Sequence, residues 1–152
     1  MTDAPAARLE VVLRTGGVRA ALVHLNGLSG HRFTALYRFA GSHARNLYFY
    51  DRENPGVDRG DDYPVEVTYC VYVRESGRPF LIEDAPADER VMGHGSQHAV
   101  RAYCGVPLYD RNGTVVGTLC HFDTQPVAVP PGTAEVMGHL SRLLQTTATG
   151  PA

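Results

Sequence analysis

The sequence predicts an α+β fold in which an antiparallel sheet carries helices on one face. Two observations support this prediction. Amphipathic helical patterns lie at both ends of the chain, and the strand-like segments between them are joined by hairpin turns rather than by helices. The 152 residues, 43 % hydrophobic and 20 % charged, have the size and composition of one globular domain. We therefore expect a single domain over residues 1–152, with an ordered core over about 5–146.

The first element is a helical region over residues 5–29. Its apolar residues recur three or four positions apart, and Gly16-Gly17 is expected to break it. Strand-forming residues then lie on both sides of the turn signal Ala40-Gly41-Ser42. This pattern predicts a hairpin with strands near 31–39 and 45–51.

The middle of the chain is less regular. Residues 54–64 are rich in Pro, Gly and Asp and predict a surface loop, whereas the spacing in "VEVTYCVYVRESG" fits a strand and a helix equally well. A short strand in "RPFLIEDA", a helical turn in "PADERV" and the Gly-rich connection "MGHGSQHAV" follow. Apolar spacing predicts a final helix over 133–146, with Thr133 as its cap.

The segment "YCGVPLYDRNGTVVGTLCHFD", residues 103–123, predicts a second hairpin. Asp110 and Gly113 suit a type I turn closed by a glycine at positive φ, which places Asp110 opposite Thr114. A two-residue Asn-Gly turn would instead shift the pairing by one residue. We prefer the first register because it sets Arg101 opposite Asp123 and so creates a cross-strand charge pair.

In the preferred register Cys104 lies opposite Cys120, and Tyr103 lies opposite His121. Alternation then places both cysteines on an apolar face that the helices would cover. Tyr103 and His121 share the other face with two glycines, which leave room for a ligand or for the close approach of another segment. We interpret the cysteines as small buried residues, with a cross-strand disulfide or a redox switch as the alternative.

Composition excludes several classes of function. All 14 basic residues are arginines, so no lysine is available for a Schiff base or a P-loop. A net charge of −2 with interspersed charges argues against nucleic acid as a partner, and no apolar run is long enough for a membrane span. The N-terminus lacks a secretion signal and the three cysteines are an odd number, so we expect a cytoplasmic protein without a structural disulfide.

Two groups of polar residues have ligand chemistry but not the spacing of a metal site. His94 and His98 stand four residues apart, with Cys70 as a conceivable third zinc ligand, yet Gly93 and Gly95 disfavour the helix that would bring the imidazoles together. Asp58, Asp61 and Asp62 lack the spacing of a calcium loop. We predict solvated loops at both places and no metal.

Aromatic residues are dense in the first hairpin. A sheet that packs on two faces needs many aromatic side chains, so most of these residues are expected in the core. The tyrosine hydroxyls among them are able to orient a ligand. Tyr48 and Tyr50 are therefore candidates for a pocket.

The stretch from Tyr69 to Asp123 resembles the GAF domain family, a small sensory fold of bacterial signalling proteins, phosphodiesterases and phytochromes. The resemblance rests on "LIEDA" and on a Tyr-x-Gly-x-Pro-Leu strand followed by a Gly-Thr-Leu-Cys strand that ends in Asp. It implies a six-stranded antiparallel sheet, with the terminal helices on one face and a small-molecule pocket on the other, capped by residues 84–100. It also implies a helix over 66–76 and a homodimer through the terminal helices.

Specialised branches of this family fit less well. The cyclic-nucleotide branch carries a lysine-containing motif that this chain lacks, and Cys120-His121 does not have the sequence context of the phytochrome bilin site. The branch that reduces free methionine sulfoxide also uses three cysteines, but its Gly-x-Cys-Gly loop is absent here. None of these ligands or activities is therefore carried over, and no cofactor is assigned.

Three hypotheses of function remain. The favoured one is a sensory module without catalytic residues that binds an unidentified small molecule and signals through a dimer or a separate partner. The alternatives are a cysteine-based redox protein, either a sensor or a reductase similar to free methionine sulfoxide reductase, and a ligand-free dimerisation module. The candidate ligand-binding residues are Tyr48, Tyr50, Cys70, His98, Tyr103 and His121.

Overall fold

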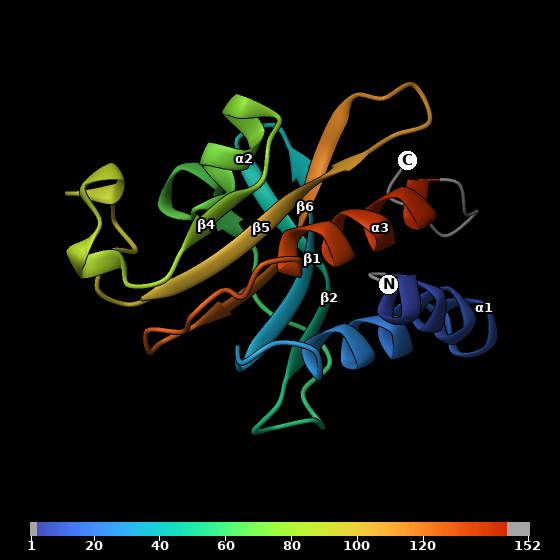
Figure 1. Ribbon diagram of the computed structural model, residues 1–152. Coiled ribbons are helices and arrows are strands. Elements are labelled where there is room, and N and C mark those ends of the chain that lie inside the picture. The colour runs from blue at the N-terminus through green and yellow to red at the C-terminus, as the bar shows by residue number, and fades with distance from the viewer. Residues whose placement is uncertain (1–2, 146–152) are drawn as a thin grey trace.

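Six antiparallel strands form one sheet in the order β3-β2-β1-β6-β5-β4 (Figure 1). The computed structural model of the chain describes residues 3–145. The predicted α+β class and the six strands implied by the resemblance are confirmed. The strands are β1 (Phe33–Ala40), β2 (His43–Asp51), β3 (Tyr63–Pro64), β4 (Phe80–Ile82), β5 (Ala102–Tyr109) and β6 (Val115–Asp123).

The helices divide between the two faces of the sheet (Figure 1). Helices α1 (Asp3–Asn26) and α3 (Thr133–Gln145) cover one face, which we call the helix face. Helix α2 (Cys70–Ser76) and the 3-10 turns Val65–Val67, Ala85–Ala87 and Glu89–Val91 lie over the opposite face, which we call the pocket face. Among the described residues, no helix has the length and apolarity that a membrane span requires.

Helix α1 buries the apolar residues that its spacing predicted. Leu9, Leu22 and Leu25 are almost fully buried against the sheet and α3. The expected break is present, because Gly17 has a φ of 88° that interrupts the helical backbone. An L-residue with a side chain rarely adopts this conformation, so glycine suits the position.

The ends of the regular elements agree closely with the sequence prediction. The first hairpin turns at Gly41, which has a positive φ, and its strands begin and end within two residues of the predicted bounds. The segment "VEVTYCVYVRESG", whose spacing fitted a strand and a helix equally well, forms a 3-10 turn and then α2. Gly77, in a left-handed conformation, ends this helix. Thr133 does not act as predicted: its hydroxyl donates to the Pro130 carbonyl instead of accepting from the helix.

The β5–β6 hairpin has the predicted turn but not the predicted register. Asp110 lies opposite Thr114, and its carboxylate accepts hydrogen bonds from the Asn112 and Thr114 amides. Tyr109 pairs with Val115, but Leu108 pairs with Gly117, so Val116 is an extra residue that forms a bulge. Beyond the bulge every pairing is shifted by one residue.

This shift reverses the predicted faces of β6. Cys104 lies opposite His121, and Tyr103 lies opposite Phe122. Cys104 and His121 therefore lie together on the helix face, whereas Cys120 lies on the pocket face with Tyr103. The prediction that both thiols share one face and that His121 shares the other with Tyr103 is wrong.

The charge pair that favoured the predicted register does not form. Arg101 lies near Asp84 at 3.5 Å, and the Asp123 carboxylate accepts hydrogen bonds from the backbone amides of Arg32 and Gln125. A carboxylate that receives two amide hydrogen bonds has no need of an arginine partner across the strands. The Asp123 carboxylate is therefore satisfied by backbone amides, and no cross-strand charge pair sets the register of this hairpin.

Candidate functional site

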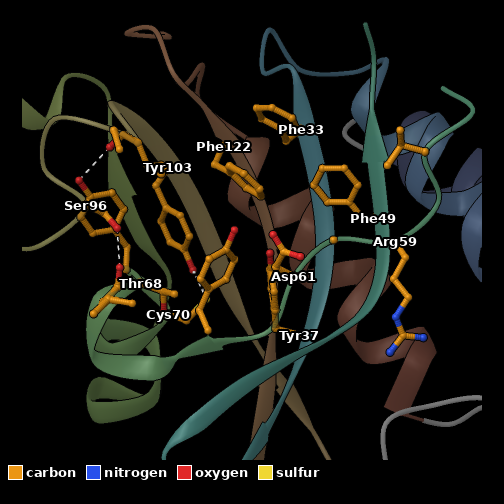
Figure 2. Close-up of a pocket in the computed structure, with 17 residues that line it drawn as sticks. Phe33, Tyr37, Phe49, Arg59, Asp61, Thr68, Cys70, Ser96, Tyr103 and Phe122 are labelled. Carbon is orange, nitrogen blue, oxygen red and sulfur yellow. Dashed lines mark hydrogen bonds between the residues drawn. The ribbon is translucent and has the colours of Figure 1, made fainter. Parts of the chain in front are cut away.

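A cavity of about 500 Å³ lies on the pocket face of the sheet, beneath the segments that connect the strands (Figure 2). Strands β1, β2, β5 and β6 supply its sheet side. The loop at residues 57–61 and the segments at 67–70 and 96–100 supply its other walls. Cavities of this size, largely apolar with a few polar groups, are typical binding sites for small molecules.

Three phenylalanines form one wall of the cavity. Phe33 of β1 stacks on Phe122 of β6 with ring centroids 4.8 Å apart, and it contacts Phe49 of β2 at 5.6 Å. Adjacent antiparallel strands bring these rings side by side because each is directed to the same face of the pleated sheet. The wall offers flat apolar surface to a planar ligand.

The floor of the cavity combines the thiol of Cys70 with the phenol of Tyr103. The phenol of Tyr103 donates to Cys70 Sγ at 3.4 Å, and Thr118 Oγ1 lies 3.2 Å from the same sulfur. Gly105 allows this arrangement, since a Cβ there would collide with the Tyr103 ring and hydroxyl. The room predicted above the strand glycines is thus partly filled by the neighbouring tyrosine.

The wall opposite the phenylalanines is held by hydrogen bonds between two connecting segments. Ser96 Oγ donates to the Val67 carbonyl, and the His94 imidazole contacts the Thr68 carbonyl at 3.2 Å. The Tyr69 hydroxyl donates to the Val100 carbonyl at 2.8 Å. These contacts connect residues 94–100 to the start of α2, so the cavity has a defined shape before any ligand enters.

The mouth of the cavity is apolar and carries one acidic group. Val57, Tyr63 and Val67 line it although each remains at least 40 % exposed. Asp61 and Arg59 also line the cavity, but the Arg59 guanidinium points away from it (Figure 2). This distribution favours an uncharged ligand over an anionic one.

Burial controls the protonation of the groups around the cavity. It raises the pKa of Tyr69 to about 12 and raises the pKa of Tyr37 and of Tyr103, so these phenols stay neutral donors. The neighbouring Cys120 thiol, and then hydrogen bonds from the Thr118 and Tyr103 hydroxyls, oppose the effect of burial on Cys70 and lower its thiol pKa.

The structure brings together only part of the predicted ligand-binding set. Cys70 and Tyr103 line the cavity. Tyr48 packs with the core of the helix face, the Tyr50 ring lies 5.8 Å from the Arg19 guanidinium of α1, and His98 is exposed. These last three residues do not line the cavity.

His121 lies on the other side of the sheet from this cavity. Its ring stacks on His31 at 5.4 Å, and its Nδ1 lies 2.7 Å from Thr34 Oγ1. It lines a second cavity of about 420 Å³ between α1 and α3. Burial is the main cause that lowers the pKa of His31 to about 4 and that of His121 to about 3, so both imidazoles are neutral near pH 7.

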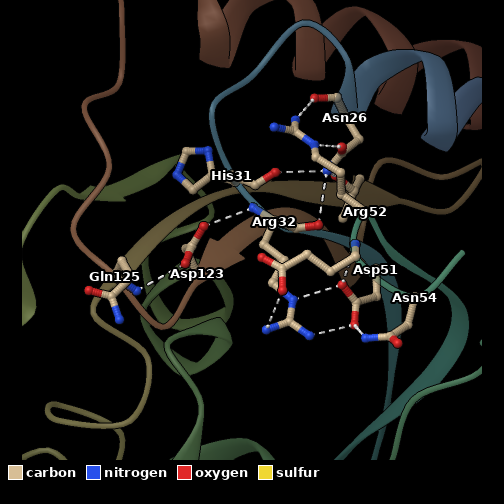
Figure 3. A network of polar contacts seen from close by, with 10 residues as sticks. Asn26, His31, Arg32, Asp51, Arg52, Asn54, Asp123 and Gln125 are labelled. Carbon is tan, nitrogen blue, oxygen red and sulfur yellow. Dashed lines mark hydrogen bonds and ion pairs between the residues drawn. The ribbon is translucent and has the colours of Figure 1, made fainter.

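A polar network ties the end of α1 to the sheet beside these histidines (Figure 3). Arg32 makes two hydrogen bonds to Asp51, at 2.8 and 2.9 Å, and Arg52 donates to the Asn26 side chain and carbonyl. Asn26 in turn donates to the Thr34 hydroxyl at 2.9 Å. The network fixes the α1–β1 connection and leaves the pocket face to apolar residues.

Sequence reasoning missed most of the aromatic wall. Phe49 follows from simple alternation, because Tyr48 and Tyr50 point to the helix face and Phe49 must point away from it. Phe122 is two residues from Cys120, so the predicted register, which set Cys120 on the helix face, set Phe122 there too. Thr68 and Ser96 lie in irregular segments, and no pattern in the sequence marks them.

Neither group of metal-ligand residue types forms a metal site among residues 3–145, where no three His, Cys, Asp or Glu side chains come together for an ion. His94 contacts the Thr68 carbonyl and the Ser96 amide, and Asp62 accepts from the Asn46 amide at 2.7 Å. The two His94 contacts join Thr68 and Ser96 of the cavity wall, and the Asp62 contact holds the end of the loop at residues 57–61 against β2. The solvated-loop interpretation therefore understates their structural role.

A comparison with protein families matches residues 6–147 to the GAF domain. The chain belongs to the GAF domain family. The match covers nearly the whole chain, including the N-terminal segment that precedes the Tyr69–Asp123 resemblance. A search of curated proteins finds no match to this chain.

Solved GAF structures share the fold at low sequence identity. Free methionine-R-sulfoxide reductase from Neisseria meningitidis, in complex with its substrate, is 15 % identical with a TM-score of 0.74, covering 95 % of this chain and 86 % of that one. The GAF domain of Acinetobacter phosphoenolpyruvate-protein phosphotransferase is 14 % identical with a TM-score of 0.75. The match covers 95 % of this chain and 90 % of that one. At these identities the likeness shows the fold alone.

A phytochrome fragment is equally similar. The chromophore binding domain of Stigmatella aurantiaca phytochrome P1 is 12 % identical with a TM-score of 0.76, covering 97 % of this chain. This chain covers 59 % of that larger protein fragment.

Proposed function

We propose that this GAF domain is a sensory module that binds an uncharged, planar, largely apolar small molecule in the cavity on the pocket face. The observation that carries the proposal is the wall of Phe33, Phe49 and Phe122, beside a floor that carries the Cys70 thiol and the Tyr103 hydroxyl. Flat apolar surface contributes binding energy, and a few polar groups fix the orientation of the ligand.

A fluorescent probe tests this proposal directly. N-phenyl-1-naphthylamine is uncharged and aromatic, and it brightens in apolar surroundings. We expect saturable binding of one probe per chain with a Kd of about 0.1 mM or tighter. The Ala99→Trp substitution places an indole at an exposed position of the cavity lining and should weaken binding at least about tenfold by blocking the site.

The matched control is Ala128→Trp, because Ala128 is also exposed but does not line the cavity. This variant should bind the probe as the unmodified protein does. Equal affinities for all three proteins, or the absence of saturable binding, would contradict the proposal. A dimer that binds no probe would instead favour a ligand-free dimerisation module.

We also propose that the module works as a homodimer through its terminal helices, with the signal passing through dimer geometry or a separate partner. Helix α1 leaves Val11 and Val23 exposed, and Leu28, just after the helix, is exposed too, whereas Leu9, Leu22 and Leu25 of α1 pack in the core of the helix face. Light scattering after size exclusion should give a dimer mass, and Val23→Glu should shift it toward the monomer. A monomer at all concentrations would contradict this part of the proposal.

A further inference from the structure

Two of the three cysteines lie in the same buried cluster beside the floor of the cavity, where Cys70 Sγ is 3.2 Å from the hydroxyl of Thr118, two residues from Cys120 on β6. Cys70 is the first residue of α2, and Cys120 lies on β6, on the same face as Thr118. Both thiols are buried and free, and each alters the pKa of the other. The predicted register set Cys120 opposite Cys104, and only the bulge in β6 brings Cys120 to the pocket face that Cys70 shares.

The surroundings of the two sulfurs are not alike. Cys70 lines the cavity and has the Tyr103 phenol, which donates to it, and the Thr118 hydroxyl as neighbours. Cys120 does not line the cavity, and its thiol donates to the Ala35 carbonyl at 3.8 Å. Hydrogen bonds to sulfur favour the thiolate, which is the reactive form of cysteine. Cys70 is thus placed as the nucleophile and Cys120 as its neighbour.

We propose that an apolar organic hydroperoxide enters the cavity and oxidises Cys70, and that Cys120 then closes a reversible disulfide with it. This inference deepens the proposed function, since it uses the same cavity and adds a class of reactant. The phenylalanine wall and the apolar mouth favour an alkyl or aryl hydroperoxide over hydrogen peroxide.

The chemistry balances without a further reactant. The Cys70 sulfur attacks the distal peroxide oxygen, an S–O bond forms, the O–O bond breaks, and the alcohol leaves with the thiol proton. Sulfur gives two electrons to the peroxide in this step. The Cys120 sulfur then attacks the Cys70 sulfenic acid, a disulfide forms, and water leaves with the second thiol proton. A dithiol added afterwards restores both thiols by exchange.

Cys104 supplies an internal control. It lies on the helix face with its thiol 3.5 Å from the Met137 sulfur, and burial raises its pKa to about 12. It should stay reduced throughout. Cys104→Ser therefore serves as the matched control for Cys70→Ser and Cys120→Ser.

The experiment treats the full chain with cumene hydroperoxide and maps the peptides by mass spectrometry. We expect one disulfide between Cys70 and Cys120, with Cys104 reduced, and a rate about tenfold or more above that with hydrogen peroxide. Cys104→Ser should behave in the same way. Cys120→Ser should instead accumulate a Cys70 sulfenic acid that dimedone traps, and Cys70→Ser should retain its thiols.

Several results would overturn the proposal: no disulfide in the unmodified chain, a disulfide that includes Cys104, or equal oxidation of Cys70→Ser. Oxidation by free methionine sulfoxide but not by the hydroperoxide would overturn it in favour of a reductase. Probe binding by Cys70→Ser distinguishes the two proposals and checks the fold. If the unmodified chain binds the probe but forms no disulfide, only the proposed thiol chemistry is contradicted. If it forms the disulfide but does not bind the probe, only the proposed ligand pocket is contradicted.

Discussion

The stacked pair His31 and His121 predicts that the protein loses stability in mild acid. Both imidazoles titrate near pH 6.5 in an unfolded chain but at about pH 4 and about pH 3 in the fold, because burial disfavours their charged forms. Their folded pKa values are depressed, so the unfolded chain binds protons more readily. The stability they contribute is complete above pH 6.5 and is lost as the pH falls, toward about 4 for His31 and toward about 3 for His121.

The size of the effect follows from the pKa values. Each imidazole lowers the free energy of unfolding by about 1.4 kcal/mol for every pH unit below 6.5. Between pH 7 and pH 5 each therefore removes about 2 kcal/mol of unfolding free energy. The pair should therefore remove about 4 kcal/mol. Asp51 does not interfere, because hydrogen bonds from Arg32 lower its pKa to about 2 and its own contribution is lost only below about pH 4.

Urea unfolding at pH 7 and pH 5 measures this loss. His31→Gln and His121→Gln should each remove about half of the pH dependence, and His98→Gln should leave it unchanged because His98 is exposed. The reasoning is refuted if the unmodified protein is equally stable at the two pH values. It is also refuted if the loss persists in full in the double variant.

Three further predictions concern packing. Gly117→Ala should lower the urea midpoint sharply or prevent folding, because its Cβ would overlap the Tyr37 carbonyl of the neighbouring strand; an unchanged midpoint would show that the strands are not so close. Leu140→Ala should cost about 2–5 kcal/mol of unfolding free energy, since Leu140 is fully buried in the core of the helix face; a loss below 1 kcal/mol would contradict that packing. Cys104 should resist iodoacetamide until urea unfolds the chain, and rapid labelling of the native protein would contradict its burial.

Local chemistry in the sequence was sufficient for the elements and turns. The break at Gly17, the turn at Gly41 and the Asp110–Gly113 turn each depend on residues within a few positions of one another, so the sequence predicts them directly. The faces of β6 depend on the bulge at Val116, which no turn residue signals. One extra residue was enough to exchange the surroundings of Cys120 and His121.

The candidate site was harder to predict because it is built from residues far apart in the sequence. Cys70 and Tyr103 were named, but their contact arises where α2 crosses β5 and β6. Ser96 and Thr68 meet through connections whose path is set by the whole fold. Alternation around Tyr48 would have identified Phe49, which is the one missed residue with a clear signal in the sequence.

The most direct test of the central claim is to map where an apolar aromatic molecule binds, by backbone amide NMR shifts during titration with N-phenyl-1-naphthylamine. Binding on the pocket face predicts saturable shifts at Thr68, Ala99 and Tyr103, which surround the cavity between α2 and the sheet. Shifts confined to Leu28 and Val136, which line the cavity between α1 and α3, would contradict it, as would the absence of any saturable shift.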